Sequence, residues 1–185
     1  GNCVSCHLIG NKEALFFDNK LHNTGVGYAE SMGLLKKKKT RVQLAPGEYV
    51  DVDTNIINSV NQQKKTNDLG LYSITENPSH RWLFSTPTLR NISLTAPYMH
   101  NGVFSTLEDV IEFYNGGGIK NNLLSPLIKK LNLSKEEKNN LKLFLDSLVG
   151  ENINILIADA LSEPVGDLTK NDPNWANKTD MGYNK

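Results

Sequence analysis

The chain has 185 residues, of which 38% are hydrophobic, and its 20 Lys and Arg residues are balanced by 20 Asp and Glu residues. This length and composition suit one domain with additional loops, and a neutral charge balance gives no support for nucleic-acid binding. No apolar run in the sequence approaches the ~20 residues that a membrane-spanning helix needs, so we expect no membrane span.

The most informative stretch is Cys3-Val4-Ser5-Cys6-His7. Two thiols separated by two residues can attach both vinyl groups of a haem, while the histidine that follows binds the iron. The alternatives are a disulfide or redox dithiol and half of a zinc site. A zinc site needs a second Cys or His pair, and the chain has only these two cysteines. A thioredoxin-like dithiol follows a strand, whereas only Gly1 and Asn2 precede Cys3.

The sequence therefore predicts a covalently bound haem c. Because such haem is attached outside the bacterial inner membrane, it also predicts a periplasmic or equivalent extracytoplasmic location. A small cytochrome c fold normally has an amphipathic helix before its haem motif, and none precedes Cys3 here. We therefore expect the chain to be the C-terminal part of a longer protein, with any signal peptide and upstream domain outside it.

Residues 8–24 mix apolar clusters with Asn and Gly, which predicts a loop around the haem edge. His22 in this loop is either an iron ligand, a propionate partner or a histidine hydrogen-bonded to the backbone. Residues 26–67 show little periodicity and are predicted to be an insertion, with a weak hairpin signal around 43–52. The basic run at 36–39 is either a solvated face or a docking patch for an acidic electron-transfer partner.

Pro87 and Pro97 bracket a segment that is biased away from helix, so residues 88–98 are predicted to run extended around the pocket. Arg90 in this segment is the best candidate to neutralise a haem propionate, because a buried carboxylate needs a fixed cationic partner. The alternative for Arg90 is an ordinary structural salt bridge.

Two helices are predicted from capping boxes, one beginning at residues 105–108 and one at Ser134 and Glu137. The first carries apolar residues on one face and is followed by three glycines, and the second ends near Gly150. The predicted inward-facing residues are Leu107, Val110, Ile111 and Tyr114 in the first helix, and Leu141, Phe144, Leu145 and Leu148 in the second. The fold class is therefore mainly α. We expect a class I cytochrome c-like haem domain at 1–150, with loop insertions, and an extended C-terminal arm at 151–185.

Four blocks of sequence stand out when they are taken together: the haem motif at 3–7, TPTLRN at 86–91, TAPYMHNG at 95–102 and TLEDVIEFY at 106–114. In this order they resemble the C-terminal haem domain of the bacterial dihaem cytochrome c peroxidase and MauG family. The resemblance covers most of residues 1–25 and 68–150. It implies that the N-terminal haem domain of the family lies outside this chain.

The sixth iron ligand decides the chemistry in this family. Its peroxidases have a methionine fourteen residues after the histidine of the Pro-Tyr-x-His block, and its MauG branch has a tyrosine there. Counting from His100 gives Tyr114. The resemblance therefore implies the MauG branch, with His7 and Tyr114 on the iron. Met99 is the rival ligand, and a core tyrosine is the remaining alternative for Tyr114.

A thioether ligand favours ferrous iron, whereas a phenolate favours higher oxidation states. The resemblance thus implies an oxidoreductase whose haem stores and relays oxidising equivalents from hydrogen peroxide, which reacts at a haem in the N-terminal domain. The alternative is a non-catalytic electron-transfer cytochrome c subunit of a larger multihaem redox complex. The implied partners are the N-terminal haem domain or another haem subunit and an electron-donor protein.

The family also binds calcium between its two haems through backbone carbonyls, and the matching positions here are Thr95 and Pro97. The alternative is that these two residues only shape the turn. By the same resemblance, His100 lies near the path between the haems and is a candidate catalytic residue with Tyr114. Trp82 is a nearby redox-active candidate by composition. The Asp that usually follows the histidine is Asn101 here, which argues against a proton or charge role at this position.

Overall fold

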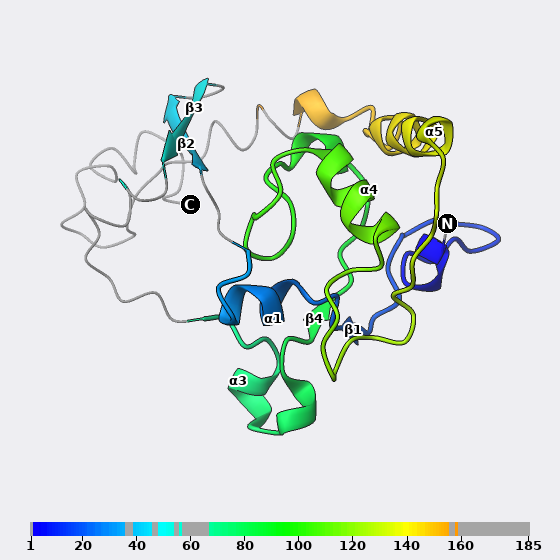
Figure 1. The fold of residues 1–185 in the computed structure, drawn as a ribbon. Coiled ribbons are helices and arrows are strands. Elements are labelled where there is room, and N and C mark those ends of the chain that lie inside the picture. Colours follow the sequence, from blue (N-terminus) through cyan, green and yellow to red (C-terminus); the bar gives the residue numbers. More distant parts are fainter. Residues whose placement is uncertain are drawn as a thin grey trace, which may run out of the picture. The chain divides into compact units, whose positions relative to one another are not determined.

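The computed structural model describes residues 2–35, 39–45, 48–53, 56, 67–155 and 158 (Figure 1). The chain divides into two compact units, Gly1–Val149 and Gly150–Lys185, and the division lies beside the predicted boundary at residue 150. Most of the second unit lies outside the described residues, and so does most of the predicted arm at 151–185. The first unit contains the predicted haem domain.

The core of the first unit is built on the helices α4 (Leu107–Asn115) and α5 (Lys135–Asp146) (Figure 1). A buried cluster joins them, and the 3-10 helix η3 (Ile92–Leu94) packs against α5. The buried members of this cluster are Tyr98, Leu107, Ile111 and Leu145. Each such side chain contributes roughly 1.5–3 kcal/mol when it is withdrawn from water. The two predicted helices and their inward faces are therefore confirmed, except that Phe144 is 43% exposed.

The capping patterns are confirmed at one helix and displaced at the other. Ser134 and Glu137 form the complete reciprocal capping box of α5. At α4 the cap is Thr106, whose hydroxyl accepts a hydrogen bond from the Asp109 backbone N–H, so the prediction of a box at 105–108 was wrong by one residue. The glycines after α4 end it as expected, because Gly117 and Gly118 have φ of 88° and 67°.

A short helix that the sequence pattern did not reveal, α1 (Val26–Ser31), buries Val26, Gly27 and Ala29. It lies beside an antiparallel pair of two-residue strands, β1 (Leu21–His22) and β4 (Phe84–Ser85) (Figure 1). Leu21 pairs with Ser85 and His22 with Phe84. This pairing fixes the loop that precedes α1 to the segment that precedes Pro87.

The weak hairpin signal is confirmed: β2 (Lys39–Ala45) pairs antiparallel with β3 (Glu48–Asp53), with a register irregularity between Gln43 and Ala45. Two further short helices, α3 (Tyr72–Thr75) and η2 (Pro78–His80), precede β4. The remaining 3-10 helix is η1 (Asn2–Ser5). Most of the basic run at 36–39 lies outside the described residues. Within the described part, the helices and little sheet are consistent with a cytochrome c-like fold, and no helix is long and apolar enough to cross a membrane.

The prediction that residues 88–98 run extended was wrong, because η3 interrupts that segment. Asn91 adopts a left-handed conformation with φ of 60°, and its backbone N–H donates to the Leu148 carbonyl at 3.0 Å. This contact with the end of the α5 segment turns the chain and sets the first turn of η3. Each proline restricts only the residue before it, so the two prolines do not prevent the turn that this tertiary hydrogen bond accompanies.

The segment at 23–25 and the loop at 118–125 lie side by side. Asn23 is fully buried, and its side chain accepts from the Gly25 N–H and donates to Asn121. The backbone N–H groups of Ile119 and Ser125 donate to Thr24 and Asn23. Gly25 has φ of 93°, and a Cβ there would overlap the Ile119 backbone. This pairing holds the chain after the haem motif against the chain after α4.

We predict that Gly25→Ala destabilises the fold by clearly more than Gly33→Ala. Both glycines have positive φ, but a Cβ at Gly33 meets nothing within 4 Å. Gly33→Ala should therefore cost only backbone strain, roughly 1–2 kcal/mol, whereas Gly25→Ala adds a clash with backbone. Urea unfolding of the two variants measures the difference. Equal unfolding midpoints would contradict the close packing of 25 against 119.

Candidate functional site

The Cys-x-x-Cys-His motif folds as one tight turn. The helix η1 begins at Asn2, and the backbone N–H groups of Cys6 and His7 donate to the Cys3 carbonyl at 3.2 and 2.9 Å. Cys3 and Cys6 are unbonded, half-buried thiols. The disulfide alternative therefore receives no support from this geometry, and both sulfurs remain available for thioether bonds.

His7 is oriented by a hydrogen bond to the loop that follows the motif. Its Nδ1 lies 2.8 Å from the Phe16 carbonyl oxygen, which can only accept. Nδ1 therefore carries the proton, and Nε2 keeps a free lone pair. A metal-binding histidine is normally held in this way, because the bond fixes the ring and its tautomer.

Phe16 supplies that carbonyl from an unusual backbone position. It has φ of 59° and is only 5% exposed. Its ring packs edge-on against Phe144 of α5, with centroids 6.3 Å apart, and the Arg90 guanidinium lies 5.6 Å from the ring centroid. One residue therefore connects His7, the helix α5 and the predicted propionate partner Arg90. The sequence reasoning did not identify it, because nothing in the residue type signals a left-handed phenylalanine.

Tyr114 lies near the motif. Burial, and after it the charges of Cys6 and Cys3, raise the pKa of its phenol to about 12. The phenol therefore lies within electrostatic range of both thiols. Its ring also packs edge-on against Phe113, with centroids 5.2 Å apart. Met99, the rival ligand, has φ of 68° and is half-buried.

The residues present fit a covalently bound haem. The two thiols, the free Nε2 of His7 and the nearby phenol supply the donors, and apolar side chains of the motif region face outward. These are Val4, Leu8, Ile9 and Leu15, each between 46% and 57% exposed. Among the residues that the structure describes, seven hydrophobic side chains are buried, so a porphyrin would add substantially to a small core.

His22 is held by two side chains and is not placed to bind iron. Its Nε2 lies 2.8 Å from an Asp18 oxygen, and its Nδ1 lies 3.3 Å from the Ser125 hydroxyl. Cys6, Asp18 and His22 also bring their potential ligand atoms within 4.8 Å of one another. Both ring nitrogens of His22 are engaged, and Cys6 belongs to the haem motif. We therefore interpret the hydrogen bonds of His22 with Asp18 and Ser125 as structural contacts next to the motif. The iron-ligand alternative for His22 receives no support from these contacts.

His100 stacks on Phe84 with centroids 3.6 Å apart and an interplanar angle of 13°. Its Nε2 lies 3.9 Å from Glu30, and the Asn101 amide donates to the same carboxylate at 2.9 Å. Burial lowers the pKa of His100, although Asp68 and Glu30 oppose this effect. His100, Asn101 and α1 are thus joined through one buried carboxylate, which the sequence did not predict.

The remaining predicted site residues are exposed or half-buried in the first unit. Thr95 is exposed and Pro97 is half-buried, and neither carbonyl accepts a hydrogen bond from another described residue. Arg90 is exposed apart from its contact with Phe16. Trp82 donates its indole N–H to Ser31 at 3.0 Å.

A cysteine pair in one turn, an oriented histidine with a free Nε2 and a small helical core define a c-type cytochrome domain. No family model matches the chain. It is 38% identical over 156 residues to the cytochrome-c peroxidase IdrP2 of Denitromonas iodatirespirans, which covers 84% of this chain and 38% of that protein. It is also 37% identical over 90 residues to the methylamine utilization protein MauG of Methylorubrum extorquens strain AM1, covering 48% of this chain and 26% of that protein.

A solved structure agrees with these sequence matches. The crystal structure of a MauG-like protein associated with microbial copper homeostasis matches with a TM-score of 0.55 and 30% identity, over 82% of this chain and 43% of that one. The chain belongs to the MauG and cytochrome c peroxidase family. It spans 36–38% of the length of the two IdrP2 relatives.

Asp18 should give the fold a distinctive acid sensitivity. Burial raises its pKa, but hydrogen bonds from His22, the Lys20 N–H and Thr86 and the charge of His22 outweigh this and lower it from 3.8 to about 2. A depressed carboxyl pKa stabilises the fold above the unfolded pKa and loses this effect as pH falls through the folded pKa. Between about pH 4 and pH 2, the free energy of unfolding of the unsubstituted chain should therefore fall as the pH falls. That of Asp18→Asn should fall less steeply.

Urea unfolding at several pH values between 2 and 6 measures that slope. Glu13→Gln is the matched control, since it removes an exposed carboxylate from the same loop. A control variant that flattens the slope as much as Asp18→Asn would contradict the role of the His22 contact.

Proposed function

We propose that the chain is the C-terminal haem domain of a MauG-like oxidoreductase, which stores and relays oxidising equivalents derived from hydrogen peroxide. The hydrogen bond from His7 to Phe16 carries the proposal, because it leaves Nε2 ready for iron beside two thiols and a buried phenol. Relatives named cytochrome-c peroxidase and MauG support the reaction class.

Cys3 and Cys6 would hold haem c through thioether bonds, and His7 would bind its iron. A haem bound there supplies a redox-active iron whose potential depends on its axial ligands. The carbonyl of Phe16 keeps the imidazole in one tautomer and one orientation. Arg90, which lies over the Phe16 ring, is placed in the same neighbourhood and neutralises a propionate through its fixed guanidinium.

Tyr114 is the sixth ligand in this proposal. Its environment alone disfavours the phenolate, because burial and the two cysteines raise the pKa. With haem attached, neither sulfur could carry a thiolate charge, and ferric iron would favour the deprotonated phenol. The same site thus keeps the tyrosine neutral without haem and allows it to ligate once haem is attached.

His100 is a catalytic residue near the path to a second haem, positioned by Phe84 and Glu30. That second haem, where peroxide reacts, belongs to an N-terminal haem domain or another haem subunit. An electron-donor protein completes the system, and a periplasmic or equivalent extracytoplasmic compartment follows from haem c attachment. The Thr95 and Pro97 carbonyls would hold calcium, because their oxygens accept no hydrogen bond from another described residue and hard oxygen ligands suit this ion.

The first test compares the spectra of the ferric protein with those of Tyr114→Phe and Met99→Ala. A phenolate-to-iron charge-transfer band that disappears in Tyr114→Phe and persists in Met99→Ala is the expected result. In the full-length protein, Tyr114→Phe with haem retained should lose peroxide-dependent oxidation by tenfold or more, since a ligand that favours oxidised iron is removed.

A sulfur-to-iron band that is lost in Met99→Ala would overturn the tyrosine assignment. A His/Tyr haem in a full-length protein that does not react with peroxide, yet forms a stable complex with other haem subunits, would favour the electron-transfer subunit instead.

Calcium removal provides a separate test in the full-length protein. Elemental analysis should find calcium in the purified protein, and chelation should change the haem spectrum. Calcium should restore the spectrum and magnesium should not, because magnesium demands a smaller octahedral site. A calcium-free protein with an unchanged spectrum would rule out this role for Thr95 and Pro97.

A further inference from the structure

Trp82 is held in an unusual conformation away from the haem motif. Its φ is 60°, which is rare for a bulky residue, and its backbone N–H donates to the Leu69 carbonyl at 2.9 Å. The indole packs edge-on against Tyr28 with centroids 5.3 Å apart. A Cβ at Gly27 would lie only 2.9 Å from the indole, so α1 approaches the ring closely. Strained residues that several contacts fix in place are often found at functional positions.

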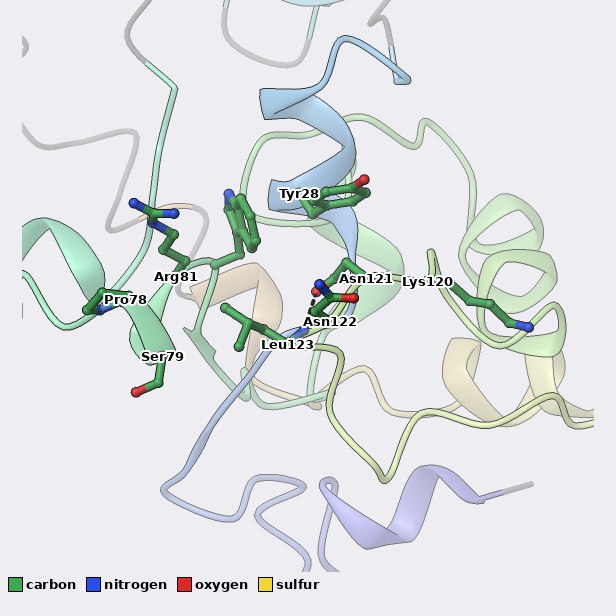
Figure 2. A pocket seen from close by; sticks show the side chains of 9 residues that line it. Tyr28, Pro78, Ser79, Arg81, Lys120, Asn121, Asn122 and Leu123 are labelled. Carbon is green, nitrogen blue, oxygen red and sulfur yellow. Dashed lines mark hydrogen bonds between the residues drawn. The ribbon is translucent and has the colours of Figure 1, made fainter.

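The Trp82 ring lines an open cavity of about 690 Å³ (Figure 2). Tyr28, Leu123 and Pro78 supply the other apolar parts of the lining, and polar side chains complete it. These are Ser79, Arg81, Lys120, Asn121 and Asn122. The combination of an aromatic centre with Arg and a polar rim is typical of protein interfaces, where Trp, Tyr and Arg contribute most of the binding energy.

The charged residues that line this cavity are all basic. None of the nine lining residues that the structure describes is acidic, although acidic and basic residues are equal in number over the whole chain. Arg81 and Lys120 lie on either side of Tyr28 in Figure 2. Neither forms an ion pair with a carboxylate of the described residues, and the Arg81 guanidinium is held 4.8 Å from the Tyr72 ring centroid.

We propose that this Trp82 cavity docks an acidic segment of a partner protein. An apolar side chain of the segment contacts Trp82 and Tyr28, and carboxylates on both sides of it pair with Arg81 and Lys120. Two cations among the lining residues, together with the aromatic rings, favour a segment with several carboxylates and an apolar side chain over a single small anion. The inference does not depend on the proposed haem chemistry, because it concerns a face with its own lining and charge.

The test is isothermal titration of the chain with the peptide acetyl-Glu-Glu-Phe-Glu-Glu-amide at low salt. The double variant Arg81→Gln/Lys120→Gln should weaken binding about tenfold, and replacing the peptide's Phe by Ala should weaken it several-fold. The control variant Lys129→Gln/Lys130→Gln removes two exposed charges outside the cavity and should change affinity less than about twofold. A peptide with Lys in place of Glu should not bind.

Three results would overturn the proposal: no binding of the acidic peptide, equal weakening by the control variant, or full displacement by free glutamate at the same carboxylate concentration. The last would make the cavity a small-anion site. Because the readout is peptide binding and not turnover, a failure here leaves the peroxide proposal intact, and a failure of that proposal leaves this one testable.

Discussion

The proposed haem site depends on one hydrogen bond, between the His7 imidazole and the Phe16 carbonyl. It determines the tautomer of the histidine and therefore which nitrogen can bind iron. The bond exists only because Phe16 adopts a left-handed backbone conformation that points its carbonyl back toward the motif. That conformation is unfavourable for phenylalanine in isolation, so it needs compensation from the surrounding packing. The buried ring, in contact with Phe144 and Arg90, supplies it.

This arrangement links the haem motif to α5. Phe144 belongs to α5, which shares a buried cluster with α4, and α4 carries Tyr114. A change in how α5 packs would therefore act on both proposed ligands, on His7 through Phe16 and on Tyr114 through α4. The Asp18, His22 and Ser125 contacts add a second connection, because Ser125 belongs to the loop that follows α4. The site is thus assembled from distant segments although its covalent anchors are only three residues apart.

The sequence predicted the features whose physics is local. The starts of α4 and α5 could be predicted to within one residue from the residue types in a single turn. The haem motif could be predicted from five consecutive residues. The helix α1 was missed because it has only six residues and begins after Gly25, which is no recognisable cap in the sequence. The η3 turn was missed because a contact between Asn91 and Leu148 decides it. Phe16 could not be found, since its role lies in a backbone angle set by tertiary packing.

The neighbourhood of His100 shows why the Asn at position 101 suits this chain. Its amide donates to Glu30, whose side chain is only 9% exposed, and the same carboxylate lies 3.9 Å from His100. An aspartate at 101 would place a second negative charge beside a poorly solvated carboxylate and raise the cost of keeping both ionised. Asn101 instead donates to Glu30 without adding charge. Burial also lowers the pKa of His100, which weakens its contribution as a cation beside Glu30. The role of this position is therefore to support a carboxylate, which an amide performs better than an acid.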